Sequence, residues 1–172
     1  MVYCIQQITS NMNIAFRVDS SRKIGTGHVI RCMTLANQLE AIGFTVYFIC
    51  KPIMGDIVNV IKSEGYDVIL LSLPNRDEEV DNFSEYSCNF DSQQVIDLCS
   101  LLSLDLIILD HYFLNYDWEK TVKDHTKLMC ISDFPSGPRA CDILLDSSLN
   151  RHHDEYRLYV ESTCILMTGS DY

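Results

Sequence analysis

The segment FRVDSSRKIGTGHVIRCMTLANQL, residues 16–39, joins the end of a strand to a loop rich in serine and glycine and then to an amphipathic helix. The apolar run Ile14–Val18 predicts the strand, and Asp19 follows directly at its carboxyl end. From His28 to Ile42 the apolar residues recur at helical spacing, and Gly43 stands where a glycine commonly ends a helix. A strand, a loop and a helix in this order are the first unit of an α/β fold.

The same alternation continues along the chain. The further predicted strands are Thr45–Cys50, Val68–Leu71, Leu106–Leu109, Leu128–Ile131, Ile143–Leu145 and Cys164–Met167. The further predicted helices are Asp56–Ser63, Ser92–Leu102 and Tyr116–His125. Runs such as Leu106–Leu109 are apolar throughout, which is typical of strands covered on both faces. The pattern therefore predicts an α/β protein with a Rossmann-like, doubly wound parallel sheet.

Three segments depart from this alternation. Leu73–Phe90 is acidic and shows no sustained period, so we predict a surface loop there. The polar stretch HHDEYRLYV, residues 152–160, predicts a short helix. Because Met12 immediately precedes the first strand, we interpret residues 1–11 as an extension in front of one domain that spans residues 12–172.

The composition is that of a globular protein, with 47% hydrophobic and 22% charged residues among 172. The eight cysteines form no CxxC pair and fall mainly in predicted helices and strands, which indicates buried free thiols in a reducing compartment. No apolar run approaches the ~18 residues of a membrane span. The N-terminus lacks the pattern of a signal peptide, so we expect a cytoplasmic protein.

The charge is unevenly distributed, and this restricts the class of ligand. The net charge of −11 argues against nucleic acids and anionic membranes as partners. Residues 1–60 nevertheless contain more basic than acidic side chains, five against three. This local surplus surrounds the glycine-containing loop and suits a phosphate-bearing ligand, although chance clustering on a solvated surface gives the same pattern.

The loop before the first helix combines the features of an anion site with a histidine. Gly25 and Gly27 let the backbone approach a ligand, and the first N–H groups of the helix favour a diphosphate. The loop is neither a dinucleotide fingerprint nor a P-loop, because the third glycine and the Gly-Lys-Ser/Thr element are absent. A helix N-terminus disfavours the charged form of His28, so its imidazole can accept a proton from water. The alternative is a histidine that only caps or packs the loop.

A second polar motif, Asp110-His111-Tyr112, follows the strand at Leu106–Leu109. Because the carboxyl ends of parallel strands share one rim of the sheet, this motif lies on the same rim as the glycine loop. It could contact a sugar or orient His28. The alternative is that Asp110 caps the following turn and His111 is a structural histidine.

Together these residues resemble the start of the UDP-sugar hydrolases of the pseudaminic acid pathway. The similar stretches are Arg17–Ser21, Ile24–Ala36, Ile108–Tyr112, Trp118–Glu119 and Cys141–Asp146. The resemblance covers nearly the whole chain from Met12 onward. The element Gly-x-Gly-His-x-x-Arg with a downstream Asp-His-Tyr is fairly specific in combination, although relatives in spore-coat polysaccharide synthesis share much of it.

The resemblance implies a glycosyltransferase-B-like fold of two Rossmann-like domains, of which this chain is the N-terminal one. It implies hydrolysis of UDP-2,4-diacetamido-2,4,6-trideoxy-β-L-altropyranose without a metal or other cofactor. His28 would activate water, which attacks the anomeric carbon, and UDP would leave with inversion. Arg17, Asp19 and Arg31 match motif positions of the family, which implies that they bind or orient the substrate.

The chain departs from the family pattern at two loops and in length. Ile131-Ser132-Asp133 stands where relatives carry a doubled aspartate, and Asp146-Ser147-Ser148 stands where they carry Asp-Gln-Asn. Both loops could face the sugar and so change substrate preference or weaken activity. The family's second domain, which supplies most nucleotide contacts, has no counterpart here. We therefore expect either a separate chain that supplies this domain or self-association through the face that the domain normally covers.

Two functions other than hydrolysis stay open at this point. A transferase of the same fold would use a sugar acceptor in place of water. A non-catalytic remnant would bind a sugar or a partner protein without turnover.

Overall fold

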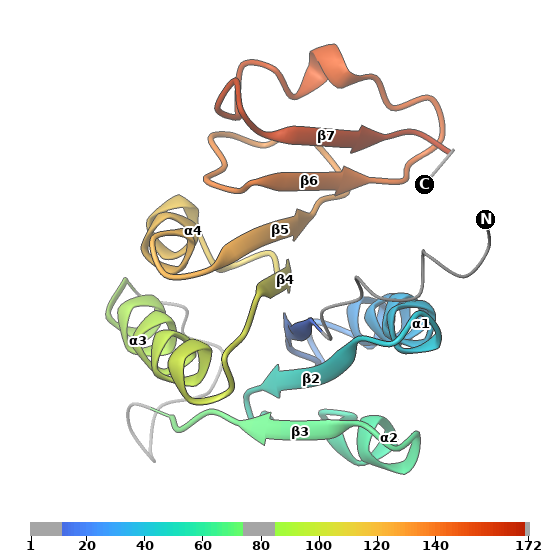
Figure 1. Ribbon diagram of the computed structural model, residues 1–172, viewed down its shortest axis with the longest axis vertical. Coiled ribbons are helices and arrows are strands. Elements are labelled where there is room, and N and C mark those ends of the chain that lie inside the picture. The colour runs from blue at the N-terminus through green and yellow to red at the C-terminus, as the bar shows by residue number, and fades with distance from the viewer. Residues whose placement is uncertain (1–11, 74–84, 171–172) are drawn as a thin grey trace, which may run out of the picture.

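The computed structural model describes residues 12–73 and 85–170, which form one seven-stranded sheet with helices on both faces (Figure 1). The strands are β1 (Asn13–Val18), β2 (Thr45–Cys50), β3 (Asp67–Leu70), β4 (Leu106–Asp110), β5 (Lys127–Ile131), β6 (Ile143–Asp146) and β7 (Ile165–Thr168). The helices are α1 (Gly27–Ala41), α2 (Val58–Ser63), α3 (Glu85–Leu101) and α4 (Tyr116–Lys123), with one 3-10 turn, η1 (His153–Glu155).

All neighbouring strands pair in parallel, in the order β3-β2-β1-β4-β5-β6-β7. In Figure 1 the arrowheads of β2 and β3 point the opposite way to those of β6 and β7, because the twist between neighbouring strands accumulates across the sheet. The predicted Rossmann-like parallel α/β fold is confirmed.

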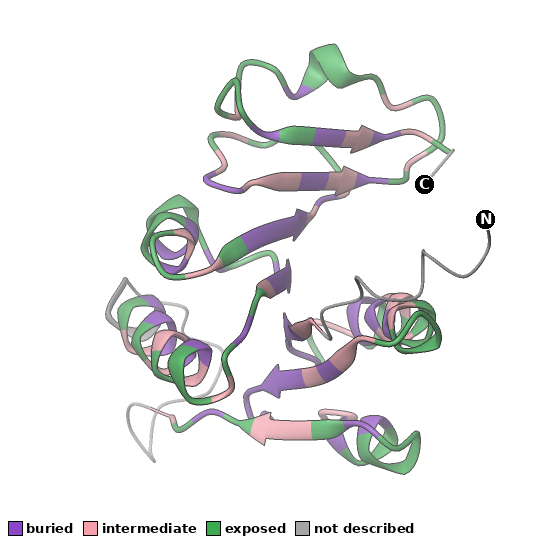
Figure 2. Ribbon diagram, viewed as in Figure 1, coloured by how far each residue is buried: buried purple, intermediate pink, exposed green. Residues whose placement is uncertain are grey.

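Each face of the sheet has its own apolar core. Helices α1 and α2 lie on one side of the sheet in Figure 1, and α3 and α4 lie on the other. Successive side chains of a strand point to opposite faces. On β1, Ala15 therefore packs in the core with α3 and α4, while Phe16 packs in the core with α1 and α2. Figure 2 shows the result, with mostly buried central strands, a less buried β3 at one edge, and helices that are exposed on their outer sides.

Helix α3 begins earlier than the sequence predicts, so the predicted loop Leu73–Phe90 is wrong from Glu85 onward. Residues 74–84 of that prediction lie outside the described residues, as does the predicted extension at residues 1–11. The buried positions of α3 recur at helical spacing, but two of them are polar: Cys88, Asp91, Ser92, Val95 and Cys99. A search for apolar periodicity therefore misses the first turns of this helix.

The predicted helix over residues 152–160 is also wrong. Only His153–Glu155 forms a 3-10 turn. Tyr156 is buried, but Leu158 is 92% exposed, so this stretch has no apolar stripe that could hold a helix against the sheet.

Two further features bear on the predicted environment. All seven cysteines within the described residues are buried, as predicted. Among the helices of residues 12–73 and 85–170, none is long and apolar enough to cross a membrane.

Candidate active site

The candidate residues meet at the point where the order of the strands reverses. β2 and β3 lie on one side of β1, and β4 to β7 lie on the other. In open α/β sheets, ligands bind beyond the carboxyl ends of the strands at such a switch point. Val18 pairs with Asp110, so the loop after β1 begins beside the Asp110-His111-Tyr112 motif.

The loop between β1 and α1 is held by its own hydrogen bonds. The Ser21 hydroxyl accepts from the N–H groups of Lys23 and Ile24, and the Gly25 N–H donates to the Ser21 carbonyl at 2.8 Å. Gly25 has φ +82°, a conformation that favours glycine. The side chain of Thr26 caps none of the N–H groups of α1, and no acidic residue lies in the first turn. This end of α1 can therefore receive an anion.

His28, in the first turn of α1, lies within a closed circuit of contacts that we call the His28 cluster. Its Nδ1 lies 2.7 Å from an oxygen of Asp110, and Arg31 donates to both oxygens of that carboxylate. Arg31 also donates to Asp133, whose second oxygen accepts from the Tyr112 hydroxyl at 2.6 Å. The Tyr112 ring meets the His28 ring edge-on, with centroids 4.4 Å apart.

The hydrogen bond to Asp110 determines which nitrogen of His28 is available. Burial by itself raises the pKa of a carboxyl, but the hydrogen bonds from Arg31 and His28 outweigh it and lower the pKa of Asp110. An ionised carboxylate only accepts hydrogen bonds, so we assign the proton of this contact to Nδ1. Nε2 then keeps a lone pair and can act as a base. Nη2 of Arg31 lies 3.0 Å from Nδ1 of His28, so the guanidinium borders both His28 and Asp110.

A second cluster lies inside the molecule around Arg17, and we call it the Arg17 cluster. The Arg17 side chain is completely buried, and its guanidinium donates to both oxygens of Asp19 and both oxygens of Asp91 at 2.6–3.2 Å. Asp91 comes from α3 and also lies 2.9 Å from Nζ of Lys51. The His111 imidazole completes the cluster, with Nε2 3.1 Å from Asp19.

Opposite charges keep both carboxylates of this cluster ionised. Burial by itself raises the pKa of Asp19 and of Asp91, but the charge of Arg17 together with the hydrogen bonds to each carboxylate outweighs burial, so both pKa values lie below the ordinary range. Nδ1 of His111 accepts from the N–H groups of Phe113 and Leu114, so Nε2 carries the proton that faces Asp19. Burial lowers the pKa of His111. His111 is therefore a neutral histidine that fixes the turn between Asp110 and α4.

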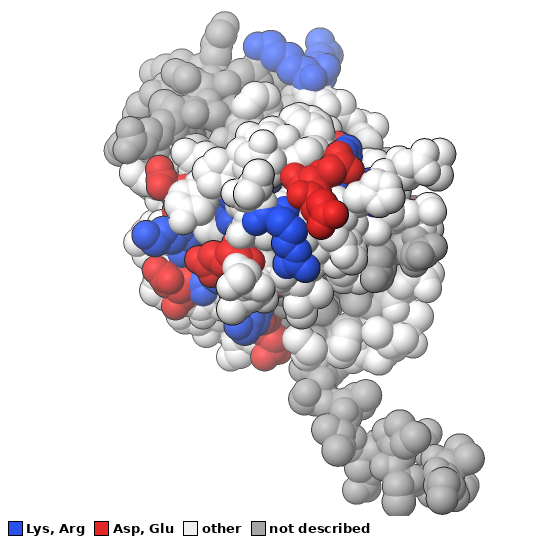
Figure 3. Space-filling view, turned by 90° about the horizontal axis from the view of Figure 1, so that it is seen from above, with Lys and Arg blue, Asp and Glu red and all other residues white. Residues whose placement is uncertain are grey.

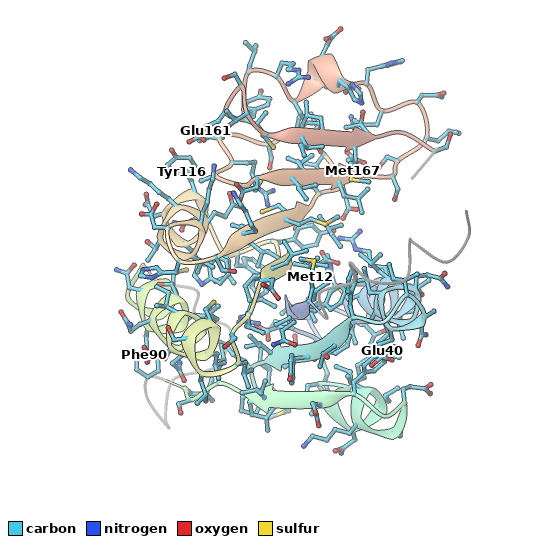
Figure 4. The ribbon with its side chains drawn as sticks, viewed as in Figure 1. Met12, Glu40, Phe90, Tyr116, Glu161 and Met167 are labelled. Carbon is cyan, nitrogen blue, oxygen red and sulfur yellow. The ribbon has the colours of Figure 1, made fainter. Side chains whose placement is uncertain are left out.

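A cavity of about 600 Å³ opens beside the His28 cluster. It lies between α4 and the segments that follow β4 and β5, and Tyr112 and Asp133 line it together with Tyr116, which is labelled in Figure 4. Glu119 and Arg139 form another part of its wall, with Glu119 Oε1 2.7 Å from Arg139 Nε. His28 does not line this cavity, but Asp110 and Tyr112 both line it and contact His28.

The surface seen in Figure 3 carries Lys and Arg side chains close to Asp and Glu, with uncharged residues between them. This face, at the β7 edge, therefore presents no extended patch of a single sign. Within residues 12–73 and 85–170, no group of three or more His, Cys, Asp or Glu side chains is arranged to hold a metal ion.

Comparison with known proteins tests the resemblance that the motifs indicate. No family model matches the chain. The chain is 28% identical over 162 residues to the UDP-2,4-diacetamido-2,4,6-trideoxy-beta-L-altropyranose hydrolase of Campylobacter jejuni, a match that covers 94% of this chain and 51% of that enzyme. The predicted resemblance is confirmed. An uncharacterized protein of Methanocaldococcus jannaschii is 23% identical over 138 residues, which are 79% of this chain and 25% of that protein. The chain thus spans about half and a quarter of the length of these two relatives.

Two solved structures share the fold. MurG of Acinetobacter baumannii superposes with a TM-score of 0.63 at 11% identity, over 91% of this chain and 45% of that one. A glycosyltransferase of Rickettsia africae superposes with a TM-score of 0.52 at 12% identity, over 72% of this chain and 30% of that one. At such identities these matches establish the fold alone, a Rossmann-like unit that covers less than half of each solved chain.

The structure divides the predicted site residues between the two clusters. His28, Arg31, Asp110 and Tyr112 belong to the His28 cluster, on the rim of the sheet. Arg17, Asp19 and His111 belong to the Arg17 cluster, Gly25 lies in the loop before α1, and Gly27 is the first residue of α1. The Asp110 carboxylate contacts His28 and Arg31. The contacts of His111 are those expected of the alternative in which His111 is a structural histidine. The binding roles of all these residues stay predictions.

Three residues of the clusters were not among the predicted site residues: Lys51, Asp91 and Asp133. Lys51 directly follows β2, and Asp133 lies two residues after β5. Their positions at strand ends on the rim are a signal that could have identified both. Asp91 lies within α3, where nothing in the local sequence points to a buried carboxylate.

Proposed function

We propose that this chain carries the water-activating half of a hydrolase that releases UDP from a UDP-linked 2,4-diacetamido-2,4,6-trideoxy sugar, in pseudaminic acid biosynthesis. The observation that supports this most strongly is the 2.7 Å contact between Nδ1 of His28 and Asp110 at the switch point of the sheet. A histidine held by a carboxylate in this way presents its other nitrogen as a general base. The N-terminus of α1 adjoins it and provides a site for the diphosphate.

The proposed step is a displacement at the anomeric carbon. Nε2 of His28 takes a proton from water as the water oxygen forms a bond to that carbon. The bond from the anomeric carbon to the β-phosphate oxygen breaks, and UDP leaves with the bonding electrons and with inversion. Asp110 stabilises the imidazolium that forms, and the N–H groups of α1 stabilise the charge of the leaving diphosphate. General base catalysis of this kind contributes about 10²- to 10⁴-fold to the rate.

The remaining features of the site fit such a substrate. The cavity beside the His28 cluster has room for an uncharged sugar, and Tyr112 connects its wall to the His28 ring. Arg17 and Asp19 are buried, so we propose that they orient the rim and do not touch the substrate. The buried cysteines fit the reducing cytoplasm predicted from the sequence.

The length of the match bears on what the chain does by itself. It spans about half of the Campylobacter jejuni enzyme, so we propose that residues 12–172 correspond to an N-terminal domain. Most nucleotide contacts would come from a second domain, and self-association would cover the face that this domain normally covers. Sedimentation at rising protein concentration tests self-association, and a monomer at every concentration contradicts it.

A transferase is the second candidate, because both structural neighbours are glycosyltransferases. The same base would then deprotonate an acceptor hydroxyl in place of water. A requirement for an added sugar acceptor in UDP release would favour the transferase. Sugar binding by the folded chain without UDP release under either condition would favour the non-catalytic alternative.

The deciding experiment measures UDP release from the diacetamido UDP-sugar by wild-type protein and by His28→Gln. His125→Gln is the matched control, since His125 is exposed just before β5, at the edge of the sheet opposite to the rim. We expect release by the wild type and the control and a loss of at least about 10²-fold in His28→Gln. Equal release by His28→Gln, or none by folded wild type, contradicts the proposal for this chain.

A further inference from the structure

Asp133 joins two side chains that border His28 from different directions. One oxygen of its carboxylate accepts from Nη1 of Arg31, and the other accepts from the Tyr112 hydroxyl at 2.6 Å. Its own backbone is held, because Nη2 of Arg151 donates to the Asp133 carbonyl at 3.0 Å. The carboxylate is therefore a fixed point at the end of β5, to which both neighbours of His28 are attached.

Both attached side chains need such a tether to keep one position. Tyr112 is 55% exposed, and the side chain of Arg31 is 34% exposed. Exposed side chains of this size sample several rotamers, and fixing them costs conformational entropy unless a contact holds them. The bond to Asp133 fixes the Tyr112 ring at the edge-on contact with His28, and it adds a third anchor to Arg31.

The charge of Asp133 also matters for the proton that His28 would accept. Asp110 and Asp133 together place two negative charges around the single positive charge of Arg31. With a neutral His28 the cluster carries one net negative charge, and a proton on His28 makes it neutral. Without the Asp133 charge, the same proton would leave a net positive cluster, with the imidazolium next to the guanidinium.

We propose that Asp133 is a positioning residue of this site, which holds Arg31 and Tyr112 against His28 and balances the charge of Arg31. Its effect on turnover rests on the proposed hydrolase function. Its effect on Tyr112 rests only on the contacts of the His28 cluster. The two parts can therefore be tested separately.

The first test needs no substrate. The hydrogen bond to Asp133 raises the pKa of Tyr112, because a phenolate would lose this bond and face a carboxylate. We expect Asp133→Asn to lower the pKa of Tyr112 toward the ordinary value. Ultraviolet titration of each protein, with the matching Tyr112→Phe protein subtracted, isolates this tyrosine from the other eight. Asp124→Asn, an exposed aspartate after α4, is the matched control and should leave Tyr112 unchanged.

The second test measures UDP release. We expect Asp133→Asn to reduce kcat/KM by about ten- to a hundredfold, mainly in kcat, as is typical when catalytic groups are displaced. Asp133→Glu should recover part of the loss, because it restores the charge, and Asp124→Asn should lose nothing. In the double variant with Tyr112→Phe, the combined loss should be smaller than the product of the single losses.

The outcomes separate the two proposals. A shift of the Tyr112 titration in Asp133→Asn supports the tether even if the wild type releases no UDP, a result that would contradict only the hydrolase function. An unchanged Tyr112 titration overturns the tether. A normal kcat in an active Asp133→Asn protein overturns the positioning role.

Discussion

Replacing Asp91 by asparagine should destabilise the protein strongly, because it removes one of two carboxylates that face buried cations. Asp91 contacts the guanidinium of Arg17 and Nζ of Lys51, and the side chains of all three are at most 4% exposed. Asparagine keeps the shape and can still accept the hydrogen bond that Nε1 of Trp118 donates at 2.9 Å. Because an amide nitrogen accepts no hydrogen bond, the change removes the charge together with the oxygen that Nη2 of Arg17 and Nζ of Lys51 contact.

The size of the loss in unfolding free energy depends on which buried charges remain in Asp91→Asn. With Asp91 neutral, Arg17 and Lys51 both lose the buried carboxylate that they share, and Arg17 keeps Asp19. Removing one partner of a buried ion pair costs about 3–5 kcal/mol. Because the free energy of unfolding of a domain is about 5–15 kcal/mol, this is a large fraction of the total. An exposed pair serves as the control: Glu161, 59% exposed and 2.9 Å from Lys123, should lose at most about 1 kcal/mol in Glu161→Gln.

The assay is urea unfolding followed by tryptophan fluorescence. Trp118 is the single tryptophan, it is 1% exposed, and its indole contacts Asp91, so its emission reports on the Arg17 cluster. At an equal dependence on urea, the shift in midpoint converts directly into a difference in unfolding free energy. If Asp91→Asn and Glu161→Gln unfold within about 0.5 kcal/mol of each other, Asp91 does not compensate the buried cations as we infer.

In urea titrations below about pH 4, the difference in unfolding free energy between wild type and Asp91→Asn should narrow. The pKa of Asp91 is lowered in the folded protein, so its contribution is present above the ordinary carboxyl pKa and is lost as pH falls toward the folded value. Asp110→Asn should reduce kcat of UDP release by about 10²- to 10⁴-fold, because an amide does not reliably hold Nδ1–H, and an unchanged kcat would contradict the assigned tautomer. Gly25 has φ +82°, so Gly25→Ala should lower the free energy of unfolding by about 1–2 kcal/mol. Gly27→Ala should not lower it, because the added Cβ meets nothing within 4 Å, and equal melting temperatures of the two variants would refute this contrast. The seven described cysteines should react with a thiol reagent only after unfolding, and rapid labelling of the native protein at any of them would contradict their burial.

The strands were the most predictable part of the fold. Leu106–Leu109 was predicted from an unbroken apolar run, and β4 differs from it only by Asp110 at the end. A strand buried on both faces needs apolar residues at every position, so the sequence itself displays it. Helix α3 needs only one buried face, and part of that face is Asp91 and Ser92. Asp91 packs there because Arg17 and Lys51 are nearby, and the Ser92 hydroxyl donates to the Asn89 carbonyl of the same helix. The partner of Asp91 lies 74 positions away in the sequence, so no local pattern contains this information.

The alternation of side chains along the strands explains why the Asp110-His111-Tyr112 motif serves two clusters. On β4, Ile108 packs in the core with α1 and Leu109 in the core with α3 and α4. Asp110 lies on the same side of the sheet as Ile108 and contacts His28. His111 lies on the same side as Leu109 and contacts Asp19 of the Arg17 cluster.

The same parity holds on the neighbouring strands. Lys51 lies two residues after Ile49, on the face of α3, where it contacts Asp91. Asp133 lies two residues after Ile131, on the face of α1, where it contacts Arg31. Along a strand, residues an even number of positions apart lie on the same face, and residues an odd number apart lie on opposite faces. Once the strands are known to be parallel and adjacent, the cluster to which a residue belongs therefore follows from its spacing to a core residue of known face. A one-residue insertion within β4 would therefore exchange the faces of Asp110 and His111, and it would separate His28 from its carboxylate without removing any residue of the site.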